Sequence, residues 1–483
     1  MTKQKSYSEN RTIALFIICA IAVITNAAVS FGKTLPPEPV LPVPSKKQLD
    51  WQRMELTMFI HFGPNTFNDV QWGTGKEHPD DFHPKNLDCR QWTKVAKEIG
   101  FKLIVLTAKH HDGFCLWPSK HTEHSVKNSS WRNGKGDVMR EFVDACKADG
   151  IKAGFYLSPW DMNAKTRATP AYADYFKAQL NELMQNYAPI HEVWFDGQNS
   201  TKVVGSKAPS PWAGFYQTIY SNNPNALIAV NGPDIRWVGN EGGFAREGES
   251  SVQDPKPRHH PGETNKVWHP AECDTPLSTW FYNSKKKHWI KNLDKLLDIY
   301  FKSVGRNSVL LLNVAPQPPD GLFGEANVAR LREFRKALDE IFSVDFTQGA
   351  KVTASNVRGN DIAFDAGKVL DNNLDTYWAT DDKVTSGWLE VELAEPRKIN
   401  VINVQEAIFL GERVEKYHVE AMVDNKWVTV AEGTVIGQRN LLRTEPVTTD
   451  RLRLVIDKAK ACPTICRFGA YFNPYQKPAK KKK

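Results

Sequence analysis

One aspartate of this 483-residue chain stands where a sheet would hold a catalytic carboxylate rigidly. Residues 192–195 are predicted to form a short buried strand, and Asp196 and Gly197 follow it directly. An acid at the end of a strand is placed at the rim of the sheet, and the glycine lets the backbone turn away. Asp196 is therefore a candidate nucleophile, and the alternative is a turn residue that only ends the strand.

Other predicted strands also end in polar groups. His61, the pair His110 and His111, Tyr156 and Asn231 all stand at such positions. In a (β/α)₈ barrel the C-terminal ends of the strands form one rim, and that rim carries the active site. A single histidine at a strand end is more often a structural hydrogen-bonding group. Polar groups at several strand ends together favour a functional site.

The elements that would position these residues alternate between strands and helices. Strands are predicted over residues 56–62, 102–108, 153–157, 192–195, 226–230 and 309–314, and helices over 92–99, 137–148, 171–187, 293–304 and 325–341. Asp137 is a candidate N-cap of its helix. The alternation predicts an α/β fold with a parallel sheet, and its length suits a closed (β/α)₈-type barrel. A doubly wound open sheet competes, but no glycine-rich phosphate loop follows an early strand.

A second, all-β domain follows the barrel. After Phe346 short alternating runs separated by turn residues replace the helical pattern, which predicts a β-sandwich. The predicted organisation is a signal peptide over residues 1–30, a proline-rich linker over 31–50, the catalytic barrel over 51–345, the sandwich over 346–475 and a basic tail over 476–483.

The N-terminus has the pattern of an export signal. Lys3, Lys5 and Arg11 precede an apolar run over residues 12–25 that is too short to span a bilayer comfortably. We expect a secreted, periplasmic protein without stable membrane association after cleavage, and an uncleaved anchor is the alternative. In such a compartment the thiols of Cys462 and Cys466 either form a local bridge or stay free.

The net charge of +8 does not point to a nucleic-acid partner. Five of the positive charges belong to the C-terminal tail, and no nucleic-acid-binding motif accompanies them. The hydrophobic fraction of 41% and the charged fraction of 24% are those of an ordinary globular protein.

Carboxylate chemistry fits the polar residues better than metal or serine chemistry. The sequence has no cysteine cluster, no His-Glu-x-x-His spacing and no Gly-x-Ser-x-Gly elbow. His110 and His111 point to opposite faces while they lie on a strand, but beyond its end they can converge, which keeps a metal hydrolase open. Glycoside hydrolysis needs two carboxyl groups that flank the scissile bond. Asp196 supplies one of them.

The second carboxyl group is expected on a mobile loop. Residues 239–249 are rich in glycine and offer three glutamates, Glu241, Glu247 and Glu249. From composition alone, this stretch is more often a solvated acidic loop than a catalytic one.

Four ordered motifs are similar to those of glycoside hydrolase family 29, the α-L-fucosidases. They are Met58–Gly63, Ala108–Phe114, Phe155–Trp160 and Trp194–Gly197, and the resemblance spans Trp51 to about Ile341. The stretch Arg236–Glu241 further resembles the subfamily that acts on α-1,3- and α-1,4-linked fucose at branched ends. The resemblance implies an exo-acting, retaining α-L-fucosidase with a double-displacement mechanism, whose partners are fucosylated oligosaccharides or glycoconjugates.

The same resemblance assigns roles to residues. It makes Asp196 the nucleophile and Glu241 the acid/base, with Glu247 and Glu249 in reserve for the second role. The residues that match the family's fucose-binding positions are His61, His110, His111, Tyr156 and Trp194.

One position departs from the family pattern. The glutamate that usually precedes the Trp-Gly-Thr-Gly stretch is Gln71 in this chain. Glutamine still hydrogen-bonds a sugar hydroxyl but carries no charge, so altered affinity rather than lost chemistry is expected. Glu77 is a nearby alternative that would reach the aglycone side.

The C-terminal domain resembles the discoidin-like F5/8 type C sandwiches. Residues 371–379 carry this likeness, with 388–391 and 411–417 behind them. It implies either a carbohydrate-binding module or a packing domain that braces the barrel, with a structural Ca²⁺ near Asp371 and Asp375. No cofactor is expected to be required, and no metal is expected in the barrel.

Two other functions stay open at this stage. One is a retaining glycosidase for another sugar, such as an α-galactoside. The other is a glycan-binding protein without catalysis, which is disfavoured because both candidate carboxylates are present.

Overall fold

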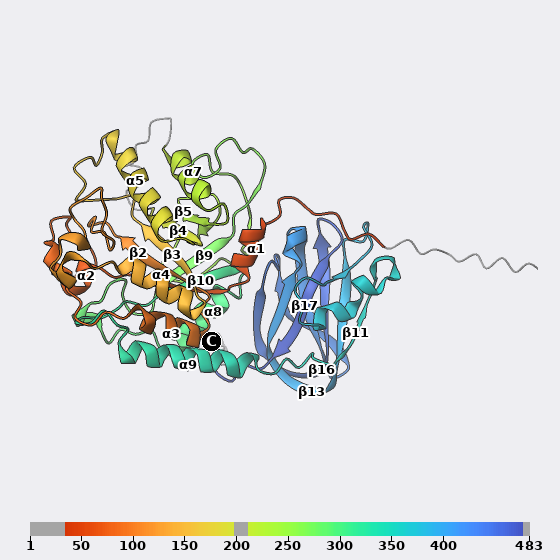
Figure 1. Ribbon diagram of the computed structural model, residues 1–483. Coiled ribbons are helices and arrows are strands. Elements are labelled where there is room, and N and C mark those ends of the chain that lie inside the picture. Colours follow the sequence, from red (N-terminus) through yellow and green to blue (C-terminus); the bar gives the residue numbers. More distant parts are fainter. Residues whose placement is uncertain (1–33, 198–210, 477–483) are drawn as a thin grey trace, which may run out of the picture. The chain divides into compact units, whose positions relative to one another are not determined.

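The computed structural model describes residues 34–197 and 211–476. The predicted signal peptide over residues 1–30 lies outside these ranges, as do residues 477–483 of the basic tail. A parallel sheet with helices around it comes first in the chain, and an antiparallel β-sandwich follows (Figure 1).

Eight strands form the parallel sheet, in the order β5-β4-β3-β2-β1-β10-β9-β6. Their bounds are β1 Leu56–Ile60, β2 Leu103–Lys109, β3 Lys152–Leu157, β4 Glu192–Phe195, β5 Leu227–Val230, β6 Arg236–Trp237, β9 Ala271–Pro276 and β10 Ser308–Asn313. A parallel bridge between Ala229 and Ile235 connects β5 with the chain that enters β6. The sheet therefore nearly closes, as the predicted (β/α)₈-type barrel requires.

Alternate residues of each strand face two different cores. On β2, Leu103 and Val105 pack with Phe59, Tyr156 and Trp194 inside the barrel. Residues 104, 106 and 108 of the same strand pack in the larger cluster that the surrounding helices contribute to. The period of two in a strand explains this division, and burial on both faces explains why the strand is apolar throughout.

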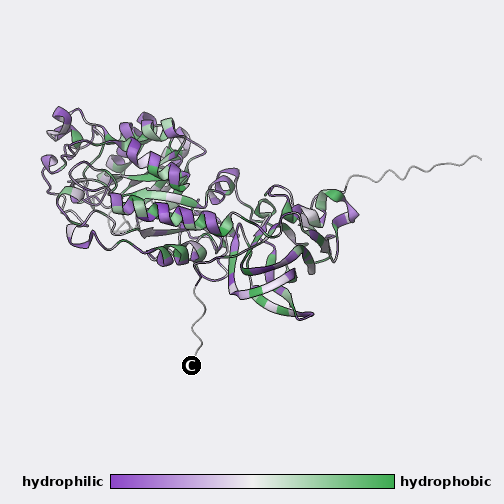
Figure 2. Ribbon diagram, turned by 90° about the horizontal axis from the view of Figure 1, so that it is seen from below, coloured by the Kyte–Doolittle hydropathy of each residue, from purple (hydrophilic) through white to green (hydrophobic). Residues whose placement is uncertain are grey.

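Six helices supply the outer layer of the barrel, namely α3 Cys89–Ile99, α4 Val138–Asp149, α5 Ala171–Asn186, α7 Trp212–Asn222, α8 Leu293–Lys302 and α9 Glu325–Phe342. Two shorter helices lie next to β1 in the chain, α1 Lys46–Gln52 before it and α2 Pro64–Phe67 after it. Figure 2 shows hydrophilic and hydrophobic residues interspersed along the helices of the outer layer, as expected for helices with one face on a sheet and the other toward water.

Two strands of the barrel were not predicted from the sequence. β6 has only two residues, and β9 contains Glu272 and Asp274, which are fully or almost fully buried. A strand that carries acids toward the interior lacks the apolar run by which buried strands are recognised. The helix α7 was also missed.

The second domain is the predicted all-β unit. Its strands are β11 Lys351–Ala354, β12 Trp378–Ala379, β13 Gly387–Glu406, β14 Val414–Val423, β15 Lys426–Gly433, β16 Asn440–Ala459 and β17 Thr464–Tyr471, and the pair β7 Val252–Gln253 and β8 Val267–Trp268 belongs to the preceding part. The strands pair antiparallel in the order β12-β17-β13-β16-β14-β15, with β11 on β13. Trp378 is completely buried in the core of this domain.

Across the described residues, no helix combines the length and the apolar character needed to cross a lipid bilayer.

The first prediction concerns the N-cap of α4. The Asp137 side chain accepts a hydrogen bond from the Arg140 amide at 2.9 Å and another from the Tyr187 hydroxyl at 2.7 Å. Asp137→Ala should cost at least the ~1 kcal/mol typical of a lost cap and lower the melting temperature of the barrel. Asp144→Ala, at an exposed position of the same helix, is the control and should change it little. Equal melting temperatures for the two variants would show that the cap contributes nothing.

Candidate active site

A cavity of about 390 Å³ opens at the carboxyl ends of the barrel strands. Side chains from most of these strands and from the loops that follow them meet there. The lining residues are Phe59, His61, Gln71, Trp72, His110, His111, Tyr156, Trp194, Asp196, Gly197, Val230, Trp237, Glu241, Asp274 and Trp280. The structure thus brings together most of the candidate site residues named from the sequence.

Asp196 lies directly beyond the end of β4 and faces this cavity. Its Oδ2 accepts a hydrogen bond from the Tyr156 hydroxyl at 2.9 Å and lies 3.7 Å from Nε2 of His111. The Asn231 side chain donates to the Asp196 carbonyl at 2.6 Å, which fixes the backbone at the turn. These contacts hold the carboxylate at a defined place on the wall.

The three histidines of the site are held as neutral rings. Burial lowers the pKa of His61 to about 3, and its Nδ1 lies 2.8 Å from Oδ1 of Asn313. Burial likewise lowers the pKa of His110 and of His111, although Asp196 opposes the shift at His111. Within the described residues Nδ1 of His110 has no hydrogen-bond partner. Neutral imidazoles suit hydrogen bonding to hydroxyl groups of an uncharged ligand.

Tyr156 and Trp194 form the aromatic part of the floor. Their rings stack with centroids 5.4 Å apart, and the His110 ring also stacks with Tyr156 at 5.6 Å. The Trp194 indole donates to Oε2 of Glu272 at 2.8 Å, below the cavity. Each ring is thus fixed by packing and by a hydrogen bond.

Of the three glutamates on the acidic loop, only Glu241 lines the cavity. The Trp280 indole donates to its Oε2 at 3.1 Å. Glu247 is turned to Arg306 at 2.8 Å, and the buried Glu249 is bound by Arg236 and Arg246. Both of these carboxylates are already occupied by arginine and lie outside the cavity lining.

Gln71 lies in the lining, but its amide is used by the backbone of a neighbouring loop. Its Nε2 donates to the Phe281 carbonyl at 2.9 Å, and its Oε1 accepts from the Phe281 amide at 3.2 Å. A glutamate could accept the second bond but could not make the first. Gln71 therefore connects the loop after β1, which contains Trp72, to the loop after β9, which contains Trp280.

Glu77 does not face the cavity. Its carboxylate accepts hydrogen bonds from the backbone amides of Thr74 and Gly75 and so closes the turn that follows Trp72. The structure gives it a role in shaping this loop, and its contact with the aglycone stays a prediction.

Asp274 is a lining residue that the sequence analysis missed. It lies on β9, its side chain is buried, and it accepts a hydrogen bond from the Trp237 indole at 2.7 Å. Burial raises the pKa of its carboxyl to about 7, and the nearby Glu241 and Asp196 add to the rise. The sequence analysis missed Asp274 because it did not predict the strand β9. A prediction of β9 would have placed Asp274 near the rim of the barrel.

One expectation about the second domain is a structural Ca²⁺ near Asp371 and Asp375. Asp371 accepts from the Asn373 amide at 2.9 Å and the Thr376 hydroxyl at 2.7 Å, while Asp375 pairs with Arg53 at 2.7 Å. Among the residues that the structure covers, no group of three or more His, Cys, Asp or Glu side chains is arranged to hold a metal ion. The structural Ca²⁺ stays a prediction.

Cys462 and Cys466 are buried free thiols in the structure. The Arg413 guanidinium donates to Sγ of Cys462 at 3.3 Å, and Sγ of Cys466 lies 3.5 Å from the Gln405 carbonyl.

Comparison with known proteins shows to which family the chain belongs. The model of the α-L-fucosidase family matches residues 45–340. The chain belongs to the α-L-fucosidase family. A model of the F5/8 type C domain matches residues 351–467, in the β-sandwich.

Relatives in this family match nearly the whole chain. Alpha-L-fucosidase 1 of Arabidopsis thaliana is 39% identical over 478 residues, which are 95% of this chain and 93% of the relative. A Ruminococcus gnavus GH29 fucosidase solved in complex with fucose is 32% identical with a TM-score of 0.83, and the match covers 92% of this chain and 98% of the other. A glycoside hydrolase 29 family member from an unknown rumen bacterium is 36% identical with a TM-score of 0.79, covering 92% and 79%.

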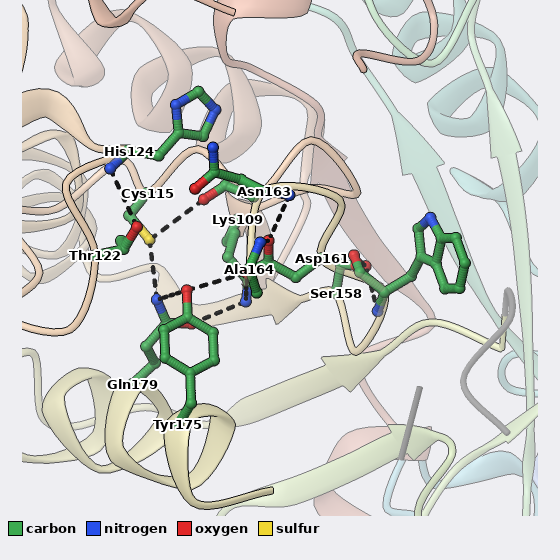
Figure 3. Close-up of polar contacts among 12 residues, drawn as sticks. Lys109, Cys115, Thr122, His124, Ser158, Asp161, Asn163, Ala164, Tyr175 and Gln179 are labelled. Atoms are coloured by element: carbon green, nitrogen blue, oxygen red, sulfur yellow. Dashed lines mark hydrogen bonds and ion pairs between the residues drawn. The ribbon is translucent and has the colours of Figure 1, made fainter. Parts of the chain in front are cut away.

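In this member of the family a buried ion pair lies behind the site (Figure 3). Nζ of Lys109, at the end of β2, lies 2.8 Å from Oδ2 of Asp161, and neither side chain is exposed. Gln179 and Tyr175 of α5 bind the same two groups, at 2.8 Å from Lys109 and 3.1 Å from Asp161. Burial opposes ionisation of Asp161, but Lys109 and the hydrogen bonds outweigh it and hold the pKa of the carboxyl below its ordinary value.

The second prediction concerns this pair. Asp161→Asn leaves a buried ammonium without its carboxylate and should destabilise the barrel by about 3–5 kcal/mol. Because the pKa of Asp161 is depressed in the folded state, this stability is present above the ordinary aspartate pKa and is lost as the pH falls below it. Thermal unfolding between pH 3 and pH 8 measures both effects.

The control replaces both charges. Lys109→Met combined with Asp161→Leu should recover much of the loss, since no buried charge is then left alone. A single variant as stable as the parent chain would contradict a charged pair at this place.

Proposed function

We propose that this α-L-fucosidase is an exo-acting, retaining enzyme in which Asp196 is the nucleophile and Glu241 the acid/base. The observation that carries the proposal is that these two carboxylates, from different loops, line the same cavity. Glu241 is also the only one of the three loop glutamates that lines it.

The proposed reaction has two displacements. Glu241 donates its proton to the departing glycosidic oxygen while Asp196 attacks the anomeric carbon, which gives a fucosyl-enzyme ester and a free aglycone. Glu241, now a carboxylate, takes a proton from water, which attacks the anomeric carbon and releases Asp196. Retention requires the two carboxyl groups to stand about 5–5.5 Å apart during the reaction.

The remaining lining residues fit a hydroxyl-rich, uncharged sugar. His61, His110 and His111 offer neutral imidazole groups, and the Tyr156 hydroxyl already orients Asp196. Phe59 supplies an apolar surface in the cavity, which suits the methyl group of a 6-deoxy sugar. An L-galactoside, which differs from an L-fucoside only at C6, presents a hydroxymethyl group at that position, and an apolar pocket rejects such an added hydroxyl only moderately.

The finer proposal is a preference for α-1,3- and α-1,4-linked fucose at branched ends. It rests on the likeness of Arg236–Glu241 to one subfamily. The exposed face of Trp237 at the cavity supports it, because it offers a flat apolar surface beside Glu241 to a second branch.

Export, a structural Ca²⁺ near Asp371 and Asp375, and glycan binding by the second domain are proposals of the same kind. They rest on the N-terminal pattern and on the likeness of the sandwich to other glycosidase-linked domains.

The third prediction tests the two catalytic roles. Asp196→Ala should abolish turnover, because no other group forms the covalent intermediate. Glu241→Ala should lower turnover of natural glycans strongly, spare aryl fucosides with good leaving groups and be rescued by azide. Steady-state kinetics on both substrate classes, with and without azide, measures this.

Glu247→Ala is the matched control, since it removes a glutamate from the same loop that lies outside the cavity. It should retain the activity of the parent chain. If Glu241→Ala keeps full activity on a natural glycan, the acid/base must instead be Glu247 or Glu249.

The fourth prediction tests the substrate. We expect release of fucose from branched Lewis-type oligosaccharides with higher kcat/KM than from aryl α-L-fucosides, and little hydrolysis of aryl α-galactosides. Product analysis by chromatography with each substrate decides this. Faster hydrolysis of the α-galactoside would favour the alternative glycosidase, and binding of fucosylated glycans without any turnover would favour the non-catalytic one.

A further inference from the structure

The strand β9 carries two buried acids on the same side. Glu272 and Asp274 are two residues apart, so their side chains point to the same face of the strand. Glu272 is the deeper one and accepts from the Trp194 indole at 2.8 Å, whereas Asp274 lines the cavity and accepts from the Trp237 indole at 2.7 Å. Each acid therefore holds one tryptophan of the site.

Asp274 stands out because the proposed reaction does not use it. Its residue is 4% exposed, yet it shares the cavity with both proposed catalytic carboxylates. The titratable groups that interact with it are Glu241 and Asp196 on neighbouring loops and Glu272 and Cys273 on its own strand.

Trp237 is the last residue of β6. It directly precedes residues 238–244, the shorter segment around Glu241 that we call the acid loop. The Trp237 backbone is in register with Glu272, and the Val238 amide donates to the Glu272 carbonyl at 2.9 Å. The chain then turns at Gly239, which has a φ of +101°, and reaches Glu241 two residues later. Ala245 marks the other end of the loop, where its amide donates to the Lys302 carbonyl at 2.7 Å.

Between these anchors the acid loop is held by its own Asn240 side chain, which accepts from the Gly242 amide at 3.0 Å and donates to the Phe244 carbonyl at 2.8 Å. Glu241 is exposed, and its carboxylate receives the Trp280 indole. The Trp237 ring, which is 37% exposed, would be free to rotate at the cavity edge without the bond to Asp274. An error of about 1 Å in the position of an acid costs on the order of a hundredfold in rate.

We propose that Asp274 is a positioning residue for the acid/base step, which fixes the Trp237 indole and through it the root of the loop that carries Glu241. This inference rests on the proposed role of Glu241. Asp274 acts as the hydrogen-bond acceptor that keeps the indole in place.

Two substitutions at Asp274 form the fifth prediction. Asp274→Ala removes the acceptor for the indole, whereas Asp274→Asn keeps an oxygen acceptor in its place. Asp274→Ala should lower kcat/KM on a natural fucosylated glycan at least tenfold and lower it much less on an aryl fucoside with a good leaving group, which needs little acid assistance. Asp274→Asn should restore the contact and stay within about threefold of the parent on both substrates.

Trp237→Phe tests the contact from the other partner. It keeps an aromatic ring at the cavity edge and removes the N–H donor, and because Trp237 is partly exposed the variant should fold. It should reproduce the substrate-dependent loss of Asp274→Ala, and the double variant should be no worse than either single one. Glu406→Gln is the matched control, since it removes another buried carboxyl whose pKa burial raises to about 7, in the sandwich. It should leave kcat/KM on both substrates unchanged.

A readout without turnover keeps the two proposals apart. In ¹⁵N-tryptophan spectra, the indole signal that Trp237→Phe deletes should move in Asp274→Ala and stay close to its place in Asp274→Asn. An unmoved signal in Asp274→Ala would overturn the inference, as would equal kinetic losses of Asp274→Ala on both substrates. Full glycan activity of Glu241→Ala would instead overturn the proposed acid, whatever the indole signal shows.

Discussion

The buried pair of Lys109 and Asp161 is the interaction on which the rim of the barrel depends. Lys109 ends β2 immediately before His110 and His111, and the Ser158 amide at the end of β3 donates to its carbonyl at 3.0 Å. Ser158 in turn places its hydroxyl 2.7 Å from Nδ1 of His111. Burying two charges is costly, and the cost is offset only because Gln179, Tyr175 and two backbone amides satisfy their remaining hydrogen bonds. The Lys109–Asp161 pair and its hydrogen-bond partners can be satisfied in only one arrangement, so the loops attached to them are held in that arrangement.

Three loops of the rim are joined through this pair. Asp161 accepts from the Asn163 amide at 3.1 Å, and the Asn163 side chain donates to the Gly75 carbonyl at 2.8 Å, which ties in the loop after β1. Gly113 closes the loop after β2 with a φ of +88°, and a Cβ there would clash with the Asp161 carboxylate. Glu77 and Gln71 continue the chain of contacts toward the cavity, one by closing the turn and the other by binding Phe281. Polar residues that line the cavity are thus held in place by the pair of Lys109 and Asp161, which lies outside the cavity lining.

The sequence predicts the barrel and most of the cavity because both follow from strand ends. Asp196, His61 and Tyr156 lie where a terminating strand must place them, and the strand β4 has the predicted bounds. What a single sequence does not reveal is which partner a polar side chain chooses. Glu77 and Gln71 were predicted to bind the sugar, and this stays a prediction. The sequence did not show that Glu77 binds its own turn or that Gln71 binds a distant backbone, because those partners come from folded loops. The strand β9 was missed for a related reason, since its buried acids are tolerable only beside tryptophan donors from other strands.

The two acids of β9 show how the barrel accommodates buried polar side chains in a packed interior. Burial raises the pKa of both Glu272 and its neighbour Glu192, so this pair enters the interior without two full charges. Each then accepts an indole N–H, Glu192 from Trp51 at 3.0 Å and Glu272 from Trp194 at 2.8 Å. Tryptophan is the apolar side chain that also donates, so it can fill the barrel and satisfy an acid at once. Asp274, two residues further along β9, forms the same kind of acid–indole pair with Trp237, where the barrel interior opens into the cavity. The same pairing that packs the core therefore also builds the wall beside the acid loop.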